Sequence, residues 1–443
     1  MQAKNSYKSI WKISFPIILS GVAQNIVNVT DTAFLGRLGI IELGAAGNAG
    51  IFYYVLMVFG MGFTIGTQII IGRRNGEGNI TAIGGLFNNG LFFLLPLALL
   101  LFLFIQTLAP AILAQLTNST EILSASLEFL KMRSFGIGFA FLNFLFIAFY
   151  TGITQTKVLT YSTFIQATVN VIFDYALIFG NFGLPEMGVK GAALASVISE
   201  LAALIYFFAY SKKRLYFKKY LLFYRLRFEG KKLLKMLKVA FPVMLQNFMA
   251  LTSWLAFFMI IEQIGEEELA VSHIVRSIYM VLMIPLFGFS SATSTLVSNL
   301  IGKGKKEEVL SLVKKVVYLS LACTALFLPL ILFFPREVTL IYTDNLNLLD
   351  SSKSVLYVVS ASMLFFSAAY ITFSAVTGTG KTLYSLAIEF VSIFIYLIGA
   401  YFIGVYFKQD LWLVWCSEFI YFTVMGSLAV LYLKFGNWRN ANI

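Results

Sequence analysis

The sequence predicts an all-helical integral membrane protein, with about twelve transmembrane helices arranged as two pseudo-symmetric six-helix bundles. Three observations support this prediction. Of the 443 residues, 59% are apolar and only 12% are charged, whereas a soluble domain carries about 25% charged residues. Apolar runs of membrane-spanning length recur along the whole chain, and its two halves repeat each other. A soluble fold is therefore excluded.

Each apolar run, formed as a helix, reaches about 30 Å, the thickness of the hydrocarbon core of a bilayer. Lys4, Lys8 and Lys12 precede the first run, as in a signal peptide, but no small-residue cleavage site follows and Asp31 lies inside the run. We therefore interpret it as the first helix. The predicted spans are 9–35, 46–71, 84–108, 127–150, 159–181, 189–211, 233–261, 272–297, 310–334, 353–377, 384–407 and 411–434.

The net charge of +12 is distributed unevenly. Most Lys and Arg residues fall in loops on one side of the predicted membrane, and residues 211–238 hold eleven of them against the single acid Glu229. Cytoplasmic loops carry an excess of basic residues, so this side is expected to be cytoplasmic, together with both termini. We interpret the basic stretch as a topology anchor that touches anionic lipid headgroups, with no nucleic-acid partner.

The two halves align without a gap at one constant offset, which places Phe15 on Phe241. Further matching pairs are Pro16 and Pro242, Gly39 and Gly265, Tyr53 and Tyr279, Gly78 and Gly304, and Gly152 and Gly378. The alignment predicts an N-terminal lobe (1–212), a basic cytoplasmic linker (213–230) and a C-terminal lobe (231–443). Because each half holds an even number of helices, the repeat is parallel, and two such bundles with a cleft between them suit a carrier.

Five carboxylates lie inside predicted spans: Asp31, Asp174, Glu200, Glu389 and Glu418. A charge at mid-membrane costs about 2.5 to 3.5 kcal/mol on insertion scales, so each is a candidate functional group. The alternative is that they are structural partners between helices. This alternative is strongest for Glu389 and Glu418, because isolated carboxylates can be structural partners between helices, and weaker for Glu200, which follows Ser196 by one turn.

Two of these acids end polar stripes at helical spacing. The stripes are Gln24, Asn28 and Asp31 in the first predicted helix, and Gln166, Asn170 and Asp174 in the fifth. At the repeat offset Asp31 falls on Phe257 and Asp174 on Ala400, so this acidic pair is confined to the first half. A desolvated carboxylate binds a proton more readily than one in water, and oxygen-rich neighbours also suit sodium. The pair therefore predicts coupling to H⁺ or Na⁺, with no cofactor and no other metal.

The chain resembles the MATE multidrug and toxic compound extrusion transporters over nearly its whole length. The matching segments are Phe15 with Pro16, residues 29–39, Asn170 to Asp174, residues 177–180 and residues 191–196. The resemblance implies a secondary transporter in the bacterial inner membrane that exchanges cationic or amphipathic organic compounds for protons or sodium.

The position of the acids resembles the DinF-like branch of that family and implies a cation site at Asp31, Asn170, Asp174 and Ser196. Another branch carries acids in helices seven and ten, but the corresponding residues 246–256 and 361–375 contain none here. The family pattern has threonine where this chain has Ser196, which favours proton over sodium coupling.

Two alternatives lead to different functions. A lipid-linked precursor flippase of the same superfamily is expected to carry membrane-embedded arginines in its cleft, but Lys131, Arg133 and Arg276 are predicted only near outer helix ends. An intramembrane enzyme needs a nucleophile with a base, or a metal cluster, at membrane depth, and the sequence suggests neither. A cleft with acids and aromatic residues but no buried basic residue predicts lipophilic, mostly cationic substrates. We also expect the transporter to work as a monomer.

Overall fold

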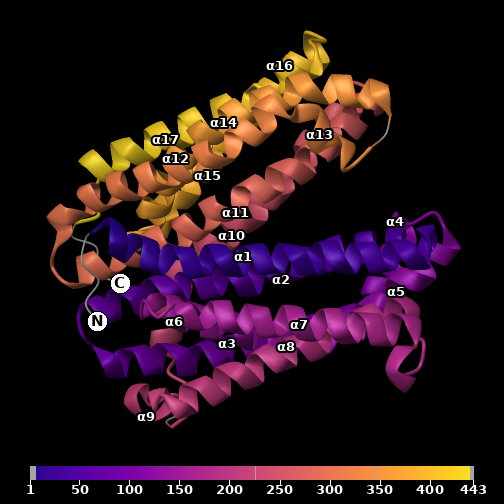
Figure 1. Cartoon of the computed structure of the whole chain (residues 1–443). Coiled ribbons are helices and arrows are strands. Elements are labelled where there is room, and N and C mark those ends of the chain that lie inside the picture. The colour runs from indigo at the N-terminus through magenta and orange to yellow at the C-terminus, as the bar shows by residue number, and fades with distance from the viewer. Residues whose placement is uncertain (1–5, 225, 344, 440–443) are drawn as a thin grey trace. The chain divides into compact units, whose positions relative to one another are not determined.

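The computed structural model describes residues 6–224, 226–343 and 345–439, and every regular element in these ranges is helical (Figure 1). The first half contains α1 (Tyr7–Leu38), α2 (Ile40–Gly76), α3 (Ile80–Thr107), α4 (Ala109–Leu116), α5 (Thr120–Ser134), α6 (Ile137–Gly152), α7 (Lys157–Phe179), η1 (Asn181–Gly183), α8 (Gly188–Lys213) and α9 (Tyr216–Tyr220). The second half contains α10 (Gly230–Glu262), α11 (Glu266–Gly302), η2 (Lys306–Glu308), α12 (Val309–Phe333), α13 (Pro335–Leu340), α14 (Leu346–Gly378), α15 (Thr382–Tyr401), η3 (Phe402–Tyr406), α16 (Leu411–Trp415) and α17 (Ser417–Phe435).

The predicted membrane fold is confirmed. Within the described ranges, eleven helices are long and apolar enough to cross a membrane, and the number rises to twelve if the bent pair α5 and α6 forms one span. The sequence predicted one helix over 127–150, but α5 and α6 meet at an angle of 53°. The break falls between Ser134 and Ile137, at Phe135 and Gly136.

Residue contacts divide the chain into two compact units. The N-terminal unit comprises residues 19–244, and the C-terminal unit comprises 6–18 and 245–439 among the described residues. This division differs from the predicted lobes at the beginnings of α1 and α10. The first residues of α1 pack in the C-terminal unit and those of α10 in the N-terminal unit. Both crossings follow a proline inside the helix, Pro16 in α1 and Pro242 in α10.

The repeat is visible in the backbone as well as in the sequence. α2 and α11 each contain 37 residues, and each follows a glycine, Gly39 and Gly265. Shortly after each helix the chain turns at a glycine in the left-handed region, Gly78 with φ of 73° and Gly304 with φ of 75°. Side chains other than glycine rarely adopt this conformation. The connections that follow α2 and α11 therefore share the same backbone geometry.

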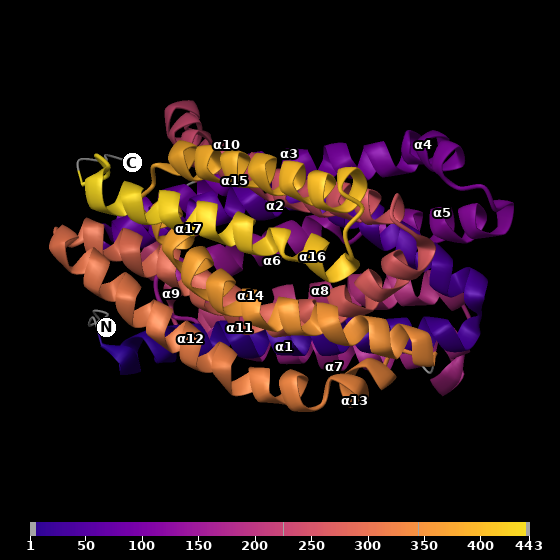
Figure 2. The same ribbon diagram turned by 90° about the horizontal axis from the view of Figure 1, so that it is seen from above.

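Each unit is a bundle of packed helices. In the N-terminal unit α7 runs along α8, and α2 packs against α5 and α6 (Figure 1). In the C-terminal unit α14 contacts α11, α12 and α17, and α17 in turn packs on α15 (Figure 2). The backbones of α7 and α8 approach closely at Gly191, where a Cβ atom would lie 2.5 Å from the carbonyl oxygen of Leu177. Only glycine allows the two helices to approach this closely.

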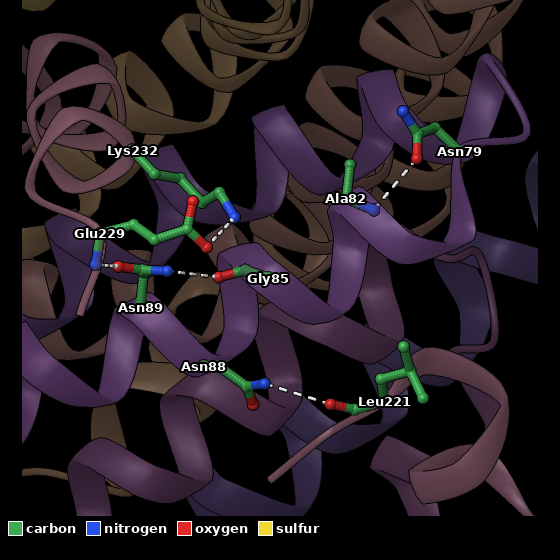
Figure 3. A network of polar contacts seen from close by, with 8 residues as sticks. All are labelled: Asn79, Ala82, Gly85, Asn88, Asn89, Leu221, Glu229 and Lys232. Atoms are coloured by element: carbon green, nitrogen blue, oxygen red, sulfur yellow. Dashed lines mark hydrogen bonds and ion pairs between the residues drawn. The ribbon is translucent and has the colours of Figure 1, made fainter. Parts of the chain in front are cut away.

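The basic stretch after α8 packs against α3 (Figure 3). Asn88 donates from Nδ2 to the carbonyl oxygen of Leu221 at 3.1 Å and accepts from the backbone N–H of Phe223 at 2.9 Å. Asn89 accepts from the backbone N–H of Glu229 at 3.0 Å, and Glu229 pairs with Lys232 at 2.6 Å. Two buried asparagines of an apolar helix therefore fix the path of this connection within the N-terminal unit.

Candidate functional site

The candidate site lies in the N-terminal unit, where α1, α7 and α8 meet. Leu35 of α1 packs with Ile178 of α7 and with Val189 and Ala192 of α8. α7 ends at Gly180, whose left-handed backbone (φ 70°) lets its N–H cap a carbonyl oxygen of the last turn. This local arrangement fixes the register of the three helices.

The predicted acidic pair is brought together by this packing. Asp174 is fully buried, with 0% of its surface exposed, and Asp31 is half-buried. Their carboxyl groups are close enough to interact directly. Asn170 lies one turn before Asp174 on α7 and is 1% exposed. All four residues predicted to form a cation site therefore lie in the N-terminal unit, and three of them, Asp31, Asn170 and Asp174, lie close together.

The polar atoms of this trio are buried without hydrogen-bond partners. They are Oδ1 of Asp31, both carboxylate oxygens of Asp174 and both amide atoms of Asn170. A buried, unpaired polar group costs about 1 to 3 kcal/mol and more when it is charged, so such groups call for a functional explanation. A proton on the acidic pair would remove the repulsion between the two carboxylates. A sodium ion would suit the same set of oxygens.

A buried ion pair lies beside the acidic pair and corrects one prediction. Arg133 of α5 donates to both carboxylate oxygens of Glu200 on α8, with Nη1 at 2.9 Å from Oε2, and the side chains are only 15% and 7% exposed. Its guanidinium carbon lies 4.5 Å from the centre of the Tyr53 ring on α2 and its charge acts on Asp31. The expectation that no basic residue is buried near the site is wrong. Arg133 lies in the last turn of α5, just before the break, and its side chain is buried in the bundle.

The surroundings of this ion pair are built around Gly136 and Asn143. A Cβ atom at Gly136 would lie 2.5 Å from Oε2 of Glu200 and 2.6 Å from Nη1 of Arg133, so a side chain there would displace the ion pair. Asn143 of α6 is 6% exposed and donates from Nδ2 to the carbonyl oxygen of Glu200 at 2.8 Å. Sequence reasoning gave no role to Asn143 or to Tyr53. For Asn143 the available signal was an amide inside an otherwise apolar span.

The remaining predicted site residues lie at the edge of the site or outside it. Gln24 and Asn28 of α1 are exposed, whereas Gln166 of α7 and Ser196 of α8 are half-buried. The carbonyl oxygen of Ser196 accepts a hydrogen bond from the hydroxyl of Ser199 at 2.8 Å. Glu200 belongs to the ion pair with Arg133, and Glu389 and Glu418 lie in the C-terminal unit.

The second half of the chain carries aromatic or small residues at the positions that match the acidic pair. Phe257, which aligns with Asp31, is 2% exposed, and Ala400, which aligns with Asp174, is 0% exposed. Phe257 packs edge-on against Trp415, with ring centres 5.2 Å apart. These residues fill the core of the C-terminal unit.

Comparison with known proteins agrees with this architecture. The sequence profile of the MatE family matches residues 16–176 and 242–402, two segments of equal length that begin at Pro16 and at its repeat partner Pro242. A Thermotoga maritima protein named as a probable multidrug resistance protein NorM is 28% identical over 440 residues, covering 98% of this chain and 93% of the relative. The multidrug resistance protein NorM of Vibrio cholerae is 22% identical over 382 residues, covering 84% and 80%.

Solved structures share the fold. A multidrug resistance MATE family transporter of the MOP superfamily, in an outward-facing conformation, superimposes with a TM-score of 0.88 at 19% identity, covering 97% of this chain and 95% of that chain. A MOP superfamily transporter from Pyrococcus furiosus gives a TM-score of 0.89 at 18% identity with the same coverage. The double match of the profile, at the spacing of the internal repeat, establishes that this chain belongs to the MatE family of membrane transporters.

Proposed function

We propose that the protein exports lipophilic, mostly cationic organic compounds by cation antiport, and that the acidic pair Asp31 and Asp174 binds the coupling cation. The observation that supports this proposal most directly is the set of buried polar atoms on Asp31, Asp174 and Asn170 that have no hydrogen-bond partner. The names of the relatives, which are multidrug resistance proteins, agree with it.

Charge around the site supports cations over anions. The one embedded arginine near the pair, Arg133, is balanced by Glu200, so it offers no free positive charge to an anionic substrate. The charge of Arg133 also acts on Asp31, but in the described ranges neither Asp31 nor Asp174 forms an ion pair. The ion pair therefore leaves the local excess of negative charge in place, and it also argues against an anion-binding flippase cleft.

We favour the proton as the coupling ion. Two adjacent carboxyl groups share a proton readily because like charges at close range cannot both be ionised without a large cost. Sodium remains the second candidate, since carboxylate and amide oxygens are ligands for hard cations. The acids in α1 and α7 also fit the DinF-like branch, which we retain as part of the proposal, and Ser196, which replaces the threonine of the family pattern, favours the proton over sodium.

The deciding experiment measures the transport of a fluorescent organic cation into inverted membrane vesicles. One set of vesicles carries only a proton gradient and the other only a sodium gradient. We expect uptake driven by the proton gradient and abolished by a protonophore. Uptake driven only by the sodium gradient would identify Na⁺ instead of H⁺ as the coupling ion. Uptake of anionic dyes alone would refute the proposed substrate class.

A further inference from the structure

The C-terminal unit contains a second buried acidic centre at the place where the repeat locates the first. At the repeat offset Tyr279 corresponds to Tyr53 and Tyr396 corresponds to Asn170. Phe257, the counterpart of Asp31, packs on Tyr396 with ring centres 5.3 Å apart. The residues that align with Asp31 and Asp174 are not acids. The tyrosines at the neighbouring aligned positions nevertheless contact a carboxylate from another helix.

That acid is Glu418, in the first turn of α17. It is 4% exposed. The hydroxyl of Tyr279 on α11 donates to its Oε2 at 3.0 Å, and the hydroxyl of Tyr396 on α15 donates to its Oε1 at 3.5 Å. Hydroxyl donors and the N-terminus of a helix favour the ionised carboxylate, whereas burial in an apolar core favours the protonated acid. These opposing effects make both forms accessible to Glu418.

A second carboxylate is linked to the first through Tyr421. Glu389 on α15 is 3% exposed and its Oε1 accepts from the hydroxyl of Tyr421 at 2.7 Å, whereas its Oε2 is buried without a hydrogen-bond partner. Tyr421 lies close enough to both carboxylates to interact with the charge of each. The rings of Tyr421 and Tyr396 lie 5.4 Å apart. The two acids and three tyrosines thus form a single polar centre inside an apolar unit.

The elements packed around this centre bring no compensating positive charge to it. In the described ranges neither glutamate forms an ion pair. From α14 the nearby titratable group is Tyr370, which interacts with Tyr421. From α11, Arg276 lies over the Phe258 ring instead, with its guanidinium carbon 5.1 Å from the ring centre. An ionised glutamate here has only hydroxyl groups to stabilise it, and proton binding is the simplest way to neutralise it.

We propose that Glu418, held between the hydroxyls of Tyr279 and Tyr396, is a second proton-binding site, connected through Tyr421 to Glu389. A proton fits better than a metal ion because the tyrosine hydroxyls already donate to the carboxylates. The described residues also contain no group of three or more His, Cys, Asp or Glu side chains placed to hold a metal. That this proton is exchanged during export rests on the proposed function, whereas the site itself does not.

The site is tested first on purified protein, by infrared difference spectra recorded between about pH 5 and about pH 9, a range above ordinary carboxyl titration in which buried carboxyl groups can titrate. A carbonyl stretch of a protonated carboxylic acid should titrate in the wild type and be reduced in Glu418→Gln, which keeps the acceptor oxygen without the proton. Tyr279→Phe should retain the band but alter the pH at which it titrates. The band should persist in Asp31→Asn and in Glu337→Gln, an exposed acid of the same unit. Spectra of Glu418→Gln identical to the wild type would overturn the proposal.

Its role in export is tested in proteoliposomes with a membrane potential and equal ion concentrations on both sides. Each net charge moved per cycle supports about a 50-fold substrate gradient at about 100 mV. Glu418→Gln should therefore accumulate about 50-fold less of a monovalent cation than the wild type, while Glu337→Gln should match the wild type. Equal accumulation by Glu418→Gln and the wild type would overturn this role. If the wild type moves no organic cation under any gradient, the proposed function fails, and the infrared test still decides the site.

Discussion

At the scale of single residues, helical spacing identified two candidate acids, and the resemblance to MATE transporters implied that they form one site. Asp31 and Asp174 end polar stripes at turns of their helices, and the structure brings their carboxyl groups together. The partner of Glu200 was not predictable in this way. Arg133 lies inside the predicted span 127–150, where any charge is a signal, but only the packing of α5 against α8 identifies its partner. The hydrogen-bond partners of Glu418 were not predictable either, because the two tyrosines come from two other helices.

The first prediction concerns the acidic pair. Asp31→Asn and Asp174→Asn should each abolish gradient-driven export while leaving the protein folded and inserted, because asparagine keeps the size and hydrogen bonding of aspartate but cannot titrate. Vesicle uptake of a fluorescent cation measures export, and size-exclusion profiles check folding. Asp350→Asn, a change at an exposed acid, is the matched control and should transport normally. Wild-type rates in both site variants would show that coupling lies elsewhere, with Glu200, Glu389 and Glu418 as the next candidates.

The second prediction concerns the ion pair of Arg133 and Glu200. Removing one partner of a buried pair leaves an unpaired charge, at a cost of about 3 to 5 kcal/mol, whereas replacing both by apolar residues is often nearly neutral. Arg133→Met and Glu200→Met should each lower the thermal unfolding temperature in detergent markedly. The double variant should be more stable than either single one. Additive losses in the double variant would mean that the two side chains do not stabilise each other.

At the scale of elements, hydropathy alone located every long helix, because a span of apolar residues must satisfy its backbone internally in lipid. It could not locate the short helices α4, α9, α13 and α16, which contain 8, 5, 6 and 5 residues and have too little length for a periodic pattern. It also missed the break between α5 and α6. The folding of the basic stretch onto α3 depends on Asn88 and Asn89, two amides whose partners are backbone groups far along the chain.

The third prediction tests the close approach of α7 and α8. In Gly191→Ala a Cβ atom would lie 2.5 Å from the carbonyl oxygen of Leu177, a distance that forces the helices apart. Because these helices carry Asp174 and Ser196, we expect reduced stability in detergent together with loss of transport. Gly47→Ala on α2 is the control, since a Cβ there meets nothing within 4 Å. That change should be neutral or stabilise by up to about 1 kcal/mol, because alanine is the better helix former. Equal melting temperatures for the two variants would refute the packing argument.

At the scale of the whole molecule, the repeat was the most informative feature of the sequence. Its constant offset is reproduced by the two profile matches and by the glycines that follow α2 and α11. Which residues belong to each compact unit was less predictable. The first turns of α1 and α10 join the unit of the other half, an exchange that depends on contacts and has no counterpart in hydropathy.

The last prediction is that both termini face the cytoplasm. Twelve spans, an even number, return the chain to the side where it started, and the eleven basic residues of 211–238 should hold the connection after the sixth span on the same side. The count depends on α5 and α6 forming one bent span, because eleven spans would leave the termini on opposite sides. Fusions of a reporter that is active only in the cytoplasm should therefore be active after Ile443 and at Gln155, but inactive at Leu184. Activity at Leu184 with none at Gln155 would show that the bent pair does not cross the membrane.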